Sequence, residues 1–518
     1  MSFFNNIFFK GIVNLLPNVK PSTTNYGRVY MKADNLLYYL NPAGDEYLLS
    51  TTLVINTMDF LLAENTTFDL LSPYIPWNSS VVVQDNVSIN TDTSIINIGT
   101  AGTYNVKYTI FIENTDNSAT GSNPRINSYI ALNGGDGNGF RRYGTNTESI
   151  VVYNGNYVYA VTVQSVIVCT TNSSIRVRAE QFSGSSTAVM GTDISEYGRL
   201  NVQRVFPPVI VGSYLSARFI GQQVLTSAST YDILWNTVNN QIGDLSVSSG
   251  DNTIVNVEST GYYNITYDVV ISGDSNDITT DPIIEAHIQT NDGTFRTGSL
   301  KERLVTTNGN VEYYKSISSI GRYTGGDELK FRVTQTTGSN TIKFSGLNDA
   351  TTDGVFKITN LNAYKMIATN SLILRRNTNV VLTDNTLTAI SWNSEVDKNG
   401  DITWGGTQIS IATTGTYDVS YTVRLNNTDN TIDGLDPRVI SFIAIDGLTA
   451  GKRYGLHQKS VITNDGNIDY IYTTTSQIEI IAGSFIELYI NQITGTTINA
   501  SSATDSEMMD ITIVHTLQ

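Results

Sequence analysis

The chain has only three histidines, which makes them the first residues to consider for catalysis or metal binding. His287, His457 and His515 occupy non-equivalent positions far apart in the sequence. A zinc site that joins all three stays open from spacing alone, but histidines in such alternating segments more often fill a core or a surface. No Ser-His-Asp constellation, P-loop or His-Glu-x-x-His motif is present. We therefore predict that the chain is not an enzyme and holds no cofactor.

Two loops rich in aspartate could bind a cation. Carboxylate oxygens in loops are ligands that calcium accepts, but the spacing here is not that of an EF-hand. Whether two of these carboxylates form the catalytic pair of a glycosidase is equally undecided, because such a pair needs a defined distance between the two groups and the sequence does not show that distance. We expect solvated loop acids, with calcium as the alternative. The residues concerned are Asp274, Asp277 and Asp281 in one loop and Asp429, Asp433 and Asp436 in the other.

An arginine recurs at three matching places, Arg142, Arg296 and Arg453. Because it recurs, we expect it to serve the fold or a subunit contact through a bidentate pair with a carboxylate. A ligand site is expected instead where the copies differ, and the third copy differs in the segments "GDITWGGTQ" and "DGLTAGKRYGLHQ". An aromatic side chain in a loop can stack on a sugar ring, and such side chains anchor interfaces. A tryptophan packed into the core is the alternative. The predicted ligand contacts are Trp404, Arg453, Tyr454 and His457.

The segments that must position these residues occur three times. "GTYNVKYTIFI" begins at Gly102, "GYYNITYDVVI" at Gly261 and "GTYDVSYTVRL" at Gly415. Further landmarks keep one order in every copy, so the chain contains three tandem copies of a domain of about 150 residues. Besides the arginines, these landmarks are Trp77, Trp235 and Trp392, then Tyr104, Tyr263 and Tyr417, and finally Gln181, Gln335 and Gln492.

Each copy has the pattern of antiparallel β-structure. In the first phrase the aromatic and branched side chains alternate with Asn105, Lys107 and Thr109, which predicts a half-buried strand. Asn-Gly and Asp-Gly pairs between apolar runs indicate hairpins. No segment keeps a helical period over three turns. We predict an all-β protein of three tandem antiparallel jelly-roll sandwiches.

Composition excludes several kinds of partner. The net charge is −16, with an isoelectric point near 4.6, so binding to nucleic acid or to an anionic membrane surface is not expected. No apolar run is long enough for a membrane span, and no secretory signal is legible. The single cysteine, Cys169, lies in an apolar run and is predicted to be a buried, inert thiol.

The order of an aromatic-Asn pair, a polar loop and "TTGTYDVSYTV" resembles C1q/TNF-like jelly-roll domains. Each copy also closes on a short apolar strand that is similar to the last core strand of that family. The resemblance covers roughly residues 56–518 in three units, though Val, Ile or Tyr often replaces the family's Phe. It implies compact trimers whose last strands pack about a threefold axis, and hence a homotrimer here.

The segment "GRVYMKADNLLYYLNPAGDEYLLS" lies before the repeats and predicts two strands, Leu36–Leu40 and Glu46–Leu49, joined by a turn. It resembles the N-terminal region of bacteriophage and large-virus fibre proteins. A hairpin that caps the first domain is the alternative. The predicted domains are a docking segment at 1–55 and jelly rolls at 56–206, 207–367 and 368–518. The joints between them are short and partly apolar, which predicts a fixed linear stack and, with trimerisation, a rod.

These observations together predict a structural virion protein, a trimeric head or tail fibre or spike. Residues 1–55 would dock on a capsid or tail protein, and the jelly rolls would contact a host-surface glycan or protein. The protein would assemble in the host cytoplasm and end on the virion surface. The alternatives are a capsid decoration protein, a bacterial C1q-like surface adhesin, or an enzyme such as a fibre-borne glycan hydrolase.

Overall fold

The computed structural model describes most of the chain. The described residues are 28–31, 37–40, 46–50, 57–61, 66–68, 74–77, 79–82, 87–90, 94–114, 120–133, 140–149, 157–185, 188–190, 199–205, 213–226, 228–273, 282–291, 296–304, 311–337, 342–345, 359–366, 368–427, 438–448, 453–460, 468–500 and 509–516. The chain divides into two compact units, Met1–Ile55 and Asn56–Leu517.

The first unit contains a three-stranded antiparallel sheet. Its strands, in spatial order, are β1 (Arg28–Met31), β2 (Leu37–Leu40) and β3 (Glu46–Ser50). Leu40 pairs with Glu46 across the "NPAGD" connection, so the predicted hairpin is confirmed. The structure adds β1, which the sequence pattern did not predict.

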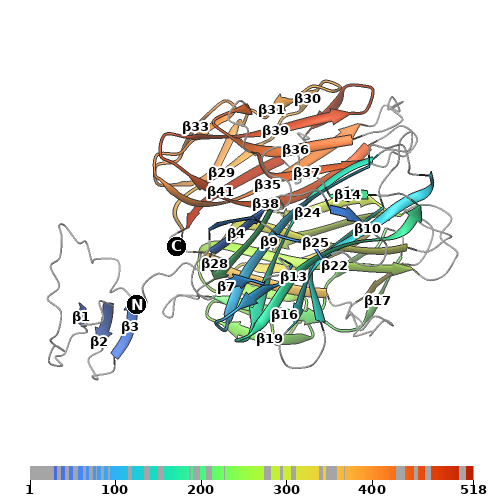
Figure 1. Ribbon diagram of the computed structural model, residues 1–518. Helices are drawn as coiled ribbons and strands as arrows, with labels where there is room; N and C mark the ends of the chain where they lie inside the picture. Colours follow the sequence, from blue (N-terminus) through green and yellow to red (C-terminus); the bar gives the residue numbers. More distant parts are fainter. Residues whose placement is uncertain are drawn as a thin grey trace. The chain divides into compact units, whose positions relative to one another are not determined.

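The second unit is all-β among its described residues and is built on three large antiparallel sheets (Figure 1). The strands of the first repeat are β4 (Thr57–Leu61), β5 (Thr66–Phe68), β6 (Ser79–Val82), β7 (Val87–Ile89), β8 (Ile96–Ile98), β9 (Gly102–Asn114), β10 (Thr120–Asn133), β11 (Phe140–Ser149), β12 (Tyr157–Cys169), β13 (Ser173–Ser185), β14 (Ala188–Met190) and β15 (Arg199–Val205).

The second repeat follows the same order of long strands. Its strands are β16 (Tyr214–Phe219), β17 (Gln222–Leu225), β18 (Thr230–Asp232), β19 (Thr237–Ile242), β20 (Leu245–Val247), β21 (Ile254–Val257), β22 (Gly261–Gly273), β23 (Ile283–Thr290), β24 (Arg296–Arg303), β25 (Val311–Tyr323), β26 (Glu328–Thr337), β27 (Ile342–Ser345) and β28 (Thr359–Met366).

The third repeat completes the unit. Its strands are β29 (Ala368–Arg376), β30 (Val380–Leu382), β31 (Thr388–Ala389), β32 (Ser394–Asn399), β33 (Thr403–Gly405), β34 (Gln408–Ser410), β35 (Gly415–Asn427), β36 (Arg438–Ile445), β37 (Arg453–Ser460), β38 (Ile468–Ile480), β39 (Phe485–Ile493), β40 (Ile498–Ala500) and β41 (Met509–Thr516).

Each repeat is a jelly-roll sandwich with its own hydrophobic core. In the third repeat one layer has the order β38-β35-β41-β29-β32 and the other has the order β33-β34-β39-β36-β37. The aromatic landmarks lie inside these cores, since Trp77, Trp235 and Trp392 are between 1 and 3% exposed. Burying such large apolar side chains stabilises each sandwich.

A second tyrosine of the repeated strand bonds to the backbone of the recurring glycine in "RRYG", "FRTG" and "KRYG". The hydroxyl of Tyr267 donates a hydrogen bond of 2.9 Å to the carbonyl of Gly298, and the other repeats have the same bond. Gly298 has a φ of +54°, in the left-handed region, and lies at a register shift between β23 and β24. Glycine is favoured there because a Cβ atom would be strained at that φ.

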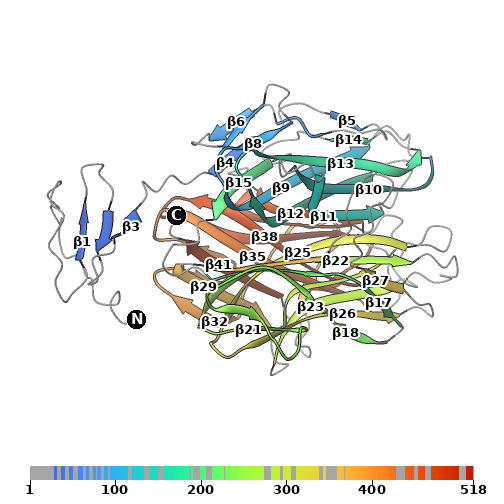
Figure 2. The same ribbon diagram turned by 90° about the horizontal axis from the view of Figure 1, so that it is seen from below.

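The large sheets run from one repeat into the next. β11 pairs with β25, β24 with β38, and β37 with β12, so that the first repeat joins the second, the second joins the third, and the third joins the first. The three equivalent strands β12, β25 and β38 also contact one another at the centre (Figure 2). The second unit is therefore a closed ring of three sandwiches about a pseudo-threefold axis, made from one chain.

The predicted linear stack is wrong, because every repeat touches both of the others. A sheet edge exposes unpaired backbone groups and is stabilised by a partner strand. Two edge strands of each repeat point toward the neighbouring repeats, and in the ring these inner edges meet in three antiparallel pairings. The connection between the second and third repeats is very short, with β28 ending at Met366 and β29 beginning at Ala368.

The prediction of a half-buried strand in the repeated phrase is also wrong. Asn105 is 2% exposed and Lys107 is 7% exposed, although both lie on the face opposite the sandwich core. The matching side chains of β22 and β35 are buried as well, including Asp268 and Asp418. The reason is that this polar face points toward the neighbouring repeats, so water does not cover it.

Candidate functional site

The junctions between repeats contain both polar and apolar contacts. Thr162 donates a hydrogen bond of 3.1 Å to the carbonyl of Leu456, and Thr473 donates one of 3.1 Å to the carbonyl of Ser299. The hydroxyl of Thr475 reaches the side-chain oxygen of Gln164 at 2.7 Å. Two apolar clusters supplement these bonds. They consist of Phe111, Ala160, Phe442, Ala444 and Leu456, and of Tyr262, Ile320, Met366, Ile373 and Val514.

Charged pairs cross the junction between the second and third repeats. Lys459 forms an ion pair with Glu302, and both side chains are buried, at 8% and 2% exposed. Tyr313 also donates a hydrogen bond to Glu302. Breaking such a buried pair on one side leaves an uncompensated charge, which is strongly destabilising. The junction between the second and third repeats therefore depends on both partners being present.

Three aspartates, of which Asp268 and Asp418 are buried and Asp510 is partly buried, lie on the faces that point toward neighbouring repeats. Burial raises the pKa of Asp268, of Asp418 and of Asp510 to about 6 in each case. Lys107 of the first repeat opposes this increase in the pKa of Asp418, and Arg375 opposes it for Asp510. Asp268 is held by hydrogen bonds instead, with Asn360 donating at 3.1 Å. Each of these three carboxyl groups therefore takes up a proton at a higher pH than an exposed aspartate does.

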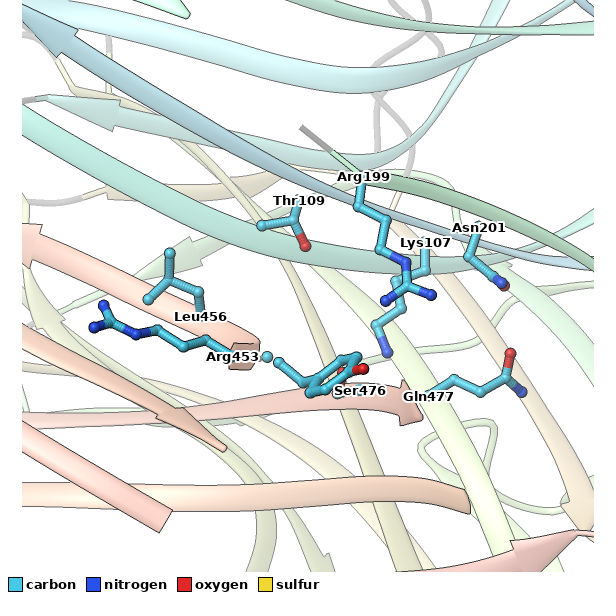
Figure 3. Close-up of a pocket in the computed structure, with 10 residues that line it drawn as sticks. Lys107, Thr109, Arg199, Asn201, Arg453, Leu456, Ser476 and Gln477 are labelled. Carbon is cyan, nitrogen blue, oxygen red and sulfur yellow. The ribbon is translucent and has the colours of Figure 1, made fainter. Parts of the chain in front are cut away.

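Two of the predicted ligand contacts lie in one cavity. Arg453 and Tyr454 of β37 line a space between the third and first repeats (Figure 3). The first repeat contributes cationic side chains, Lys107 from β9 and Arg199 from β15, which the sequence pattern did not single out. A signal for Lys107 was available, because the matching residues in the other copies are Thr266 and Ser420.

The other two predicted contacts do not line that cavity. His457 is 4% exposed, shares a hydrogen bond of 2.7 Å with the hydroxyl of Tyr470, and stacks on Tyr472 with ring centroids 3.8 Å apart. Its ring is thus part of the interior. Trp404 lies on β33, packs partly buried against the core of the third repeat, and donates a hydrogen bond of 2.8 Å to Glu395.

The recurring arginines contact both rings and acids. The guanidinium of Arg142 lies 4.1 Å from the centre of the Tyr129 ring and 3.7 Å from Glu180. Arg296 donates a hydrogen bond of 3.1 Å to Glu285. Arg453 lies 4.5 Å above the Phe442 ring.

The remaining landmarks serve the fold. The hydroxyls of Tyr104, Tyr263 and Tyr417 each donate to a carbonyl four residues earlier, at 2.7–2.8 Å. Gln492 is buried and donates to the carbonyl of Leu382 at 3.0 Å, which ties β39 to β30. Gln335 is buried as well, and Gln181 pairs with Ile126 in the β10–β13 ladder.

Metal-binding residues can be judged only in the described part of the chain, which contains no cluster of three or more His, Cys, Asp or Glu. The aspartates of the two predicted acidic loops lie outside the described residues. The prediction for Cys169 is confirmed, because the thiol is 2% exposed and burial raises its pKa to about 12. In the part of the chain that the structure describes, no helix is long and apolar enough to cross a membrane.

Comparisons with known proteins found no matching family model and no matching curated protein. Among solved structures the chain is similar to an Eiger TNF from S. frugiperda, with 10% identity and a TM-score of 0.22 over 29% of this chain and 93% of that one. It is also similar to PNGF-II, with 9% identity and a TM-score of 0.21 over 80% of this chain and 98% of that one.

A third similar structure is the tandem CBM22-1-CBM22-2 domain of Xyn10C from Paenibacillus barcinonensis. The identity is 9% and the TM-score 0.13, over 59% of this chain and 99% of that one. At these scores no argument about function follows from the three likenesses.

Proposed function

We propose that the chain is a structural virion protein, a head or tail fibre or spike whose ring of jelly rolls attaches to a host-surface glycan or protein. The observation that carries this proposal is the closed ring of three sandwiches formed by one chain. Rings of C1q/TNF-like domains present several copies of one surface at the same time, and weak single contacts gain affinity by avidity.

Residues 1–55 would dock on a capsid or tail protein, and the protein would be displayed on the virion surface after assembly in the host cytoplasm. The predicted homotrimer stays a prediction. The edges β11, β12, β24, β25, β37 and β38 are paired within one chain, so whole chains would associate through other surfaces. The N-terminal segment is the proposed place for such a contact.

The proposal is tested by binding of the full chain to an array of neutral and acidic glycans, followed by binding to cells. Attachment predicts saturable binding to some members of the array, or to cells, without chemical change of the bound glycan. Mass spectrometry of the glycans after incubation checks the second point. An absence of binding to glycans and cells alike would contradict attachment, and cleaved glycans would favour the enzyme alternative.

A further inference from the structure

The layer of β10, β11 and β13 in the first repeat carries a row of arginine and tyrosine side chains (Figure 2). Along β13, Arg176 and Arg178 flank Val177, whose side chain lies in the core of the first repeat. Because side chains alternate along a strand, both arginines lie on the face turned away from that core. Tyr129 of β10 lies opposite Arg178, and β11 contributes Arg142. The row, called the arginine ladder below, consists of Tyr74, Tyr129, Arg142, Arg176 and Arg178.

The guanidinium groups of the arginine ladder lie over the tyrosine rings. Arg176 lies 4.4 Å and Arg178 lies 5.0 Å from the centre of the Tyr74 ring. Arg178 also lies 5.7 Å from the centre of the Tyr129 ring, and Arg142 lies 4.1 Å from it. A guanidinium held against a ring by its flat face keeps N–H donors in its plane that can bind an oxyanion.

Among the described residues, one carboxylate forms ion pairs with the arginine ladder. Glu180 lies 3.7 Å from Arg142 and 3.5 Å from Arg178. Its Oε1 also accepts a hydrogen bond of 3.3 Å from Asn127. The described contact of Arg176 is the Tyr74 ring. Three positive charges thus surround one negative charge, and this surplus lies on a chain whose net charge is −16.

The arginine ladder is open to solvent at its charged ends. The side chains of Arg142 and Arg178 are 18% and 23% exposed, whereas Tyr129 is 1% exposed. The Nε atoms of all three arginines are buried and have no hydrogen-bond partner among the described residues. The rings therefore hold the arginines from below, and the outer ends of the guanidinium groups face the surface. Partly buried charges of this kind are less screened by salt than fully exposed ones.

In the second repeat an acid stands in the place of the tyrosine. Asp232 lies opposite Arg332 as Tyr74 lies opposite Arg178. Asp232 accepts hydrogen bonds of 3.1 Å from Lys330 and 2.8 Å from Arg332. These two cations are therefore paired with a carboxylate rather than held by a ring.

In the third repeat an acid and an aromatic residue stand where β13 has its two arginines. Glu487 and Tyr489 of β39 occupy these places. Glu487 accepts hydrogen bonds of 3.0 Å from Thr407 and 2.8 Å from Tyr489. A row of cations over tyrosine rings is therefore particular to the first repeat.

The spacing of the cations favours a ligand with several acidic groups. Arg176 and Arg178 are two residues apart on one strand, which separates their backbones by about 7 Å. Arg176 and Arg142 flank Ala131 from its two neighbouring strands, which separates their backbones by about 10 Å. One carboxylate or sulfate group does not reach across such distances, whereas successive acidic groups along a glycan chain do. A guanidinium binds the oxygens of either group with paired N–H donors.

We propose that the arginine ladder binds a glycan chain that carries several sulfate or carboxylate groups, with Arg142, Arg176 and Arg178 as its cationic contacts. The inference rests on the proposed attachment function and narrows its ligand class. It also places the contact on the first repeat, where the sequence pattern did not predict it.

The test uses the full chain and three hexasaccharide probes. A heparin hexasaccharide carries sulfates and carboxylates, a hyaluronan hexasaccharide carries carboxylates alone, and maltohexaose is the neutral reference. Isothermal titration calorimetry gives the affinities. We expect one or both acidic probes to bind saturably and maltohexaose to bind at least about tenfold more weakly. The affinity of an acidic probe should fall when NaCl is raised from about 50 to about 500 mM.

The decisive variant is Arg176→Gln, which removes the guanidinium above the Tyr74 ring. Its matched control is Lys330→Gln, which removes one positive charge at the corresponding place of the second repeat, where Asp232 pairs with it. Arg176→Gln should weaken the binding of an acidic probe about fivefold, whereas Lys330→Gln should change it less than about twofold. Unfolding midpoints equal to that of the unchanged chain show that both variants are folded.

A second variant tests the arginine ladder in the opposite direction. Glu180→Gln removes the carboxylate that competes for Arg142 and Arg178, so an acidic probe should bind about fivefold more tightly. Asp251→Asn changes the net charge by the same amount at an exposed acid of the second repeat and should leave the affinity unchanged. Damage to the fold would weaken binding, so a gain in affinity separates ligand contact from a structural role.

Binding of acidic probes that neither Arg176→Gln nor Glu180→Gln changes would overturn the site. Equal binding of maltohexaose and the acidic probes would overturn the ligand class and leave attachment standing. If no probe binds while the chain binds cells, the inference fails alone. If cells are not bound either, the proposed function fails with it.

Discussion

The buried aspartates predict that the ring becomes more stable as the pH falls from 7 to 5. Asp268, Asp418 and Asp510 lie between repeats, and their pKa values are raised to about 6 from a reference of 3.8. A carboxyl group with a raised pKa binds its proton more tightly in the folded than in the unfolded chain. Stability is therefore gained as the pH falls through 6 and lost as it rises through 6.

The size of the effect follows from the shift. One pKa unit corresponds to about 1.4 kcal/mol, so each group would add about 3 kcal/mol once both states are fully titrated. Between pH 7 and pH 5 almost only the folded state takes up protons, which gives slightly more than about 1 kcal/mol per group and about 3–4 kcal/mol for the three together. For a unit of this length that is a rise of about 4 °C in the unfolding midpoint.

Differential scanning calorimetry of the full chain at pH 5, 6 and 7 measures this rise. Asp268→Asn should remove about a third of the pH dependence, because it removes one of the three titrating groups. Asp268 is chosen because no cation is among the groups that set its pKa, so the substitution leaves no unpaired positive charge. The matched control is Asp251→Asn, an exposed acid whose pKa is lowered by bonds from Thr253, so its titration lies below this window. A midpoint that is flat or falls toward pH 5 would refute the reasoning.

Three further predictions test parts of the fold. Lys459→Glu or Glu302→Lys alone should lower the free energy of unfolding by about 3 kcal/mol, and the double swap should recover part of this loss. Denaturant titrations measure both, and additive losses would mean that the two side chains do not interact. Gly298→Ala should cost about 1–3 kcal/mol because of its positive φ, whereas Gly405→Ala, with open space around it, should cost less than about 1 kcal/mol. Cys169 should react with thiol reagents only on unfolding, because it is buried with a raised pKa, and fast labelling of the native chain would contradict its position.

The strands of each sandwich were predictable because they depend on local alternation. The period of two through Tyr104, Val106 and Tyr108, followed by turn residues, specifies a core strand without any knowledge of distant residues. The same pattern in three copies gave the three sandwiches. The jelly-roll expectation therefore agreed with the structure.

The ring was not predictable from these signals. Its junctions pair residues far apart in the chain, such as Asn146 with Lys315, and no periodicity marks such a pair. A face that carries Asn105, Lys107 and Thr109 has the same pattern whether water or another polar face covers it. For the same reason the cavity of Lys107 and Arg199 joins two repeats that no sequence motif connects. Arg453 and Tyr454 were identified because the third copy differs in their loop.

The most direct test of the closed ring is a disulfide between the first and third repeats. Ala160 of β12 lies opposite Gln458 of β37, so an Ala160→Cys and Gln458→Cys pair should be close enough to bond. Peptide mapping of the oxidised full chain should show this crosslink within single chains, at a yield that does not change on dilution. Each single variant should show no crosslink. A double variant that stays reduced under oxidising conditions, or that crosslinks only between chains, would contradict the ring.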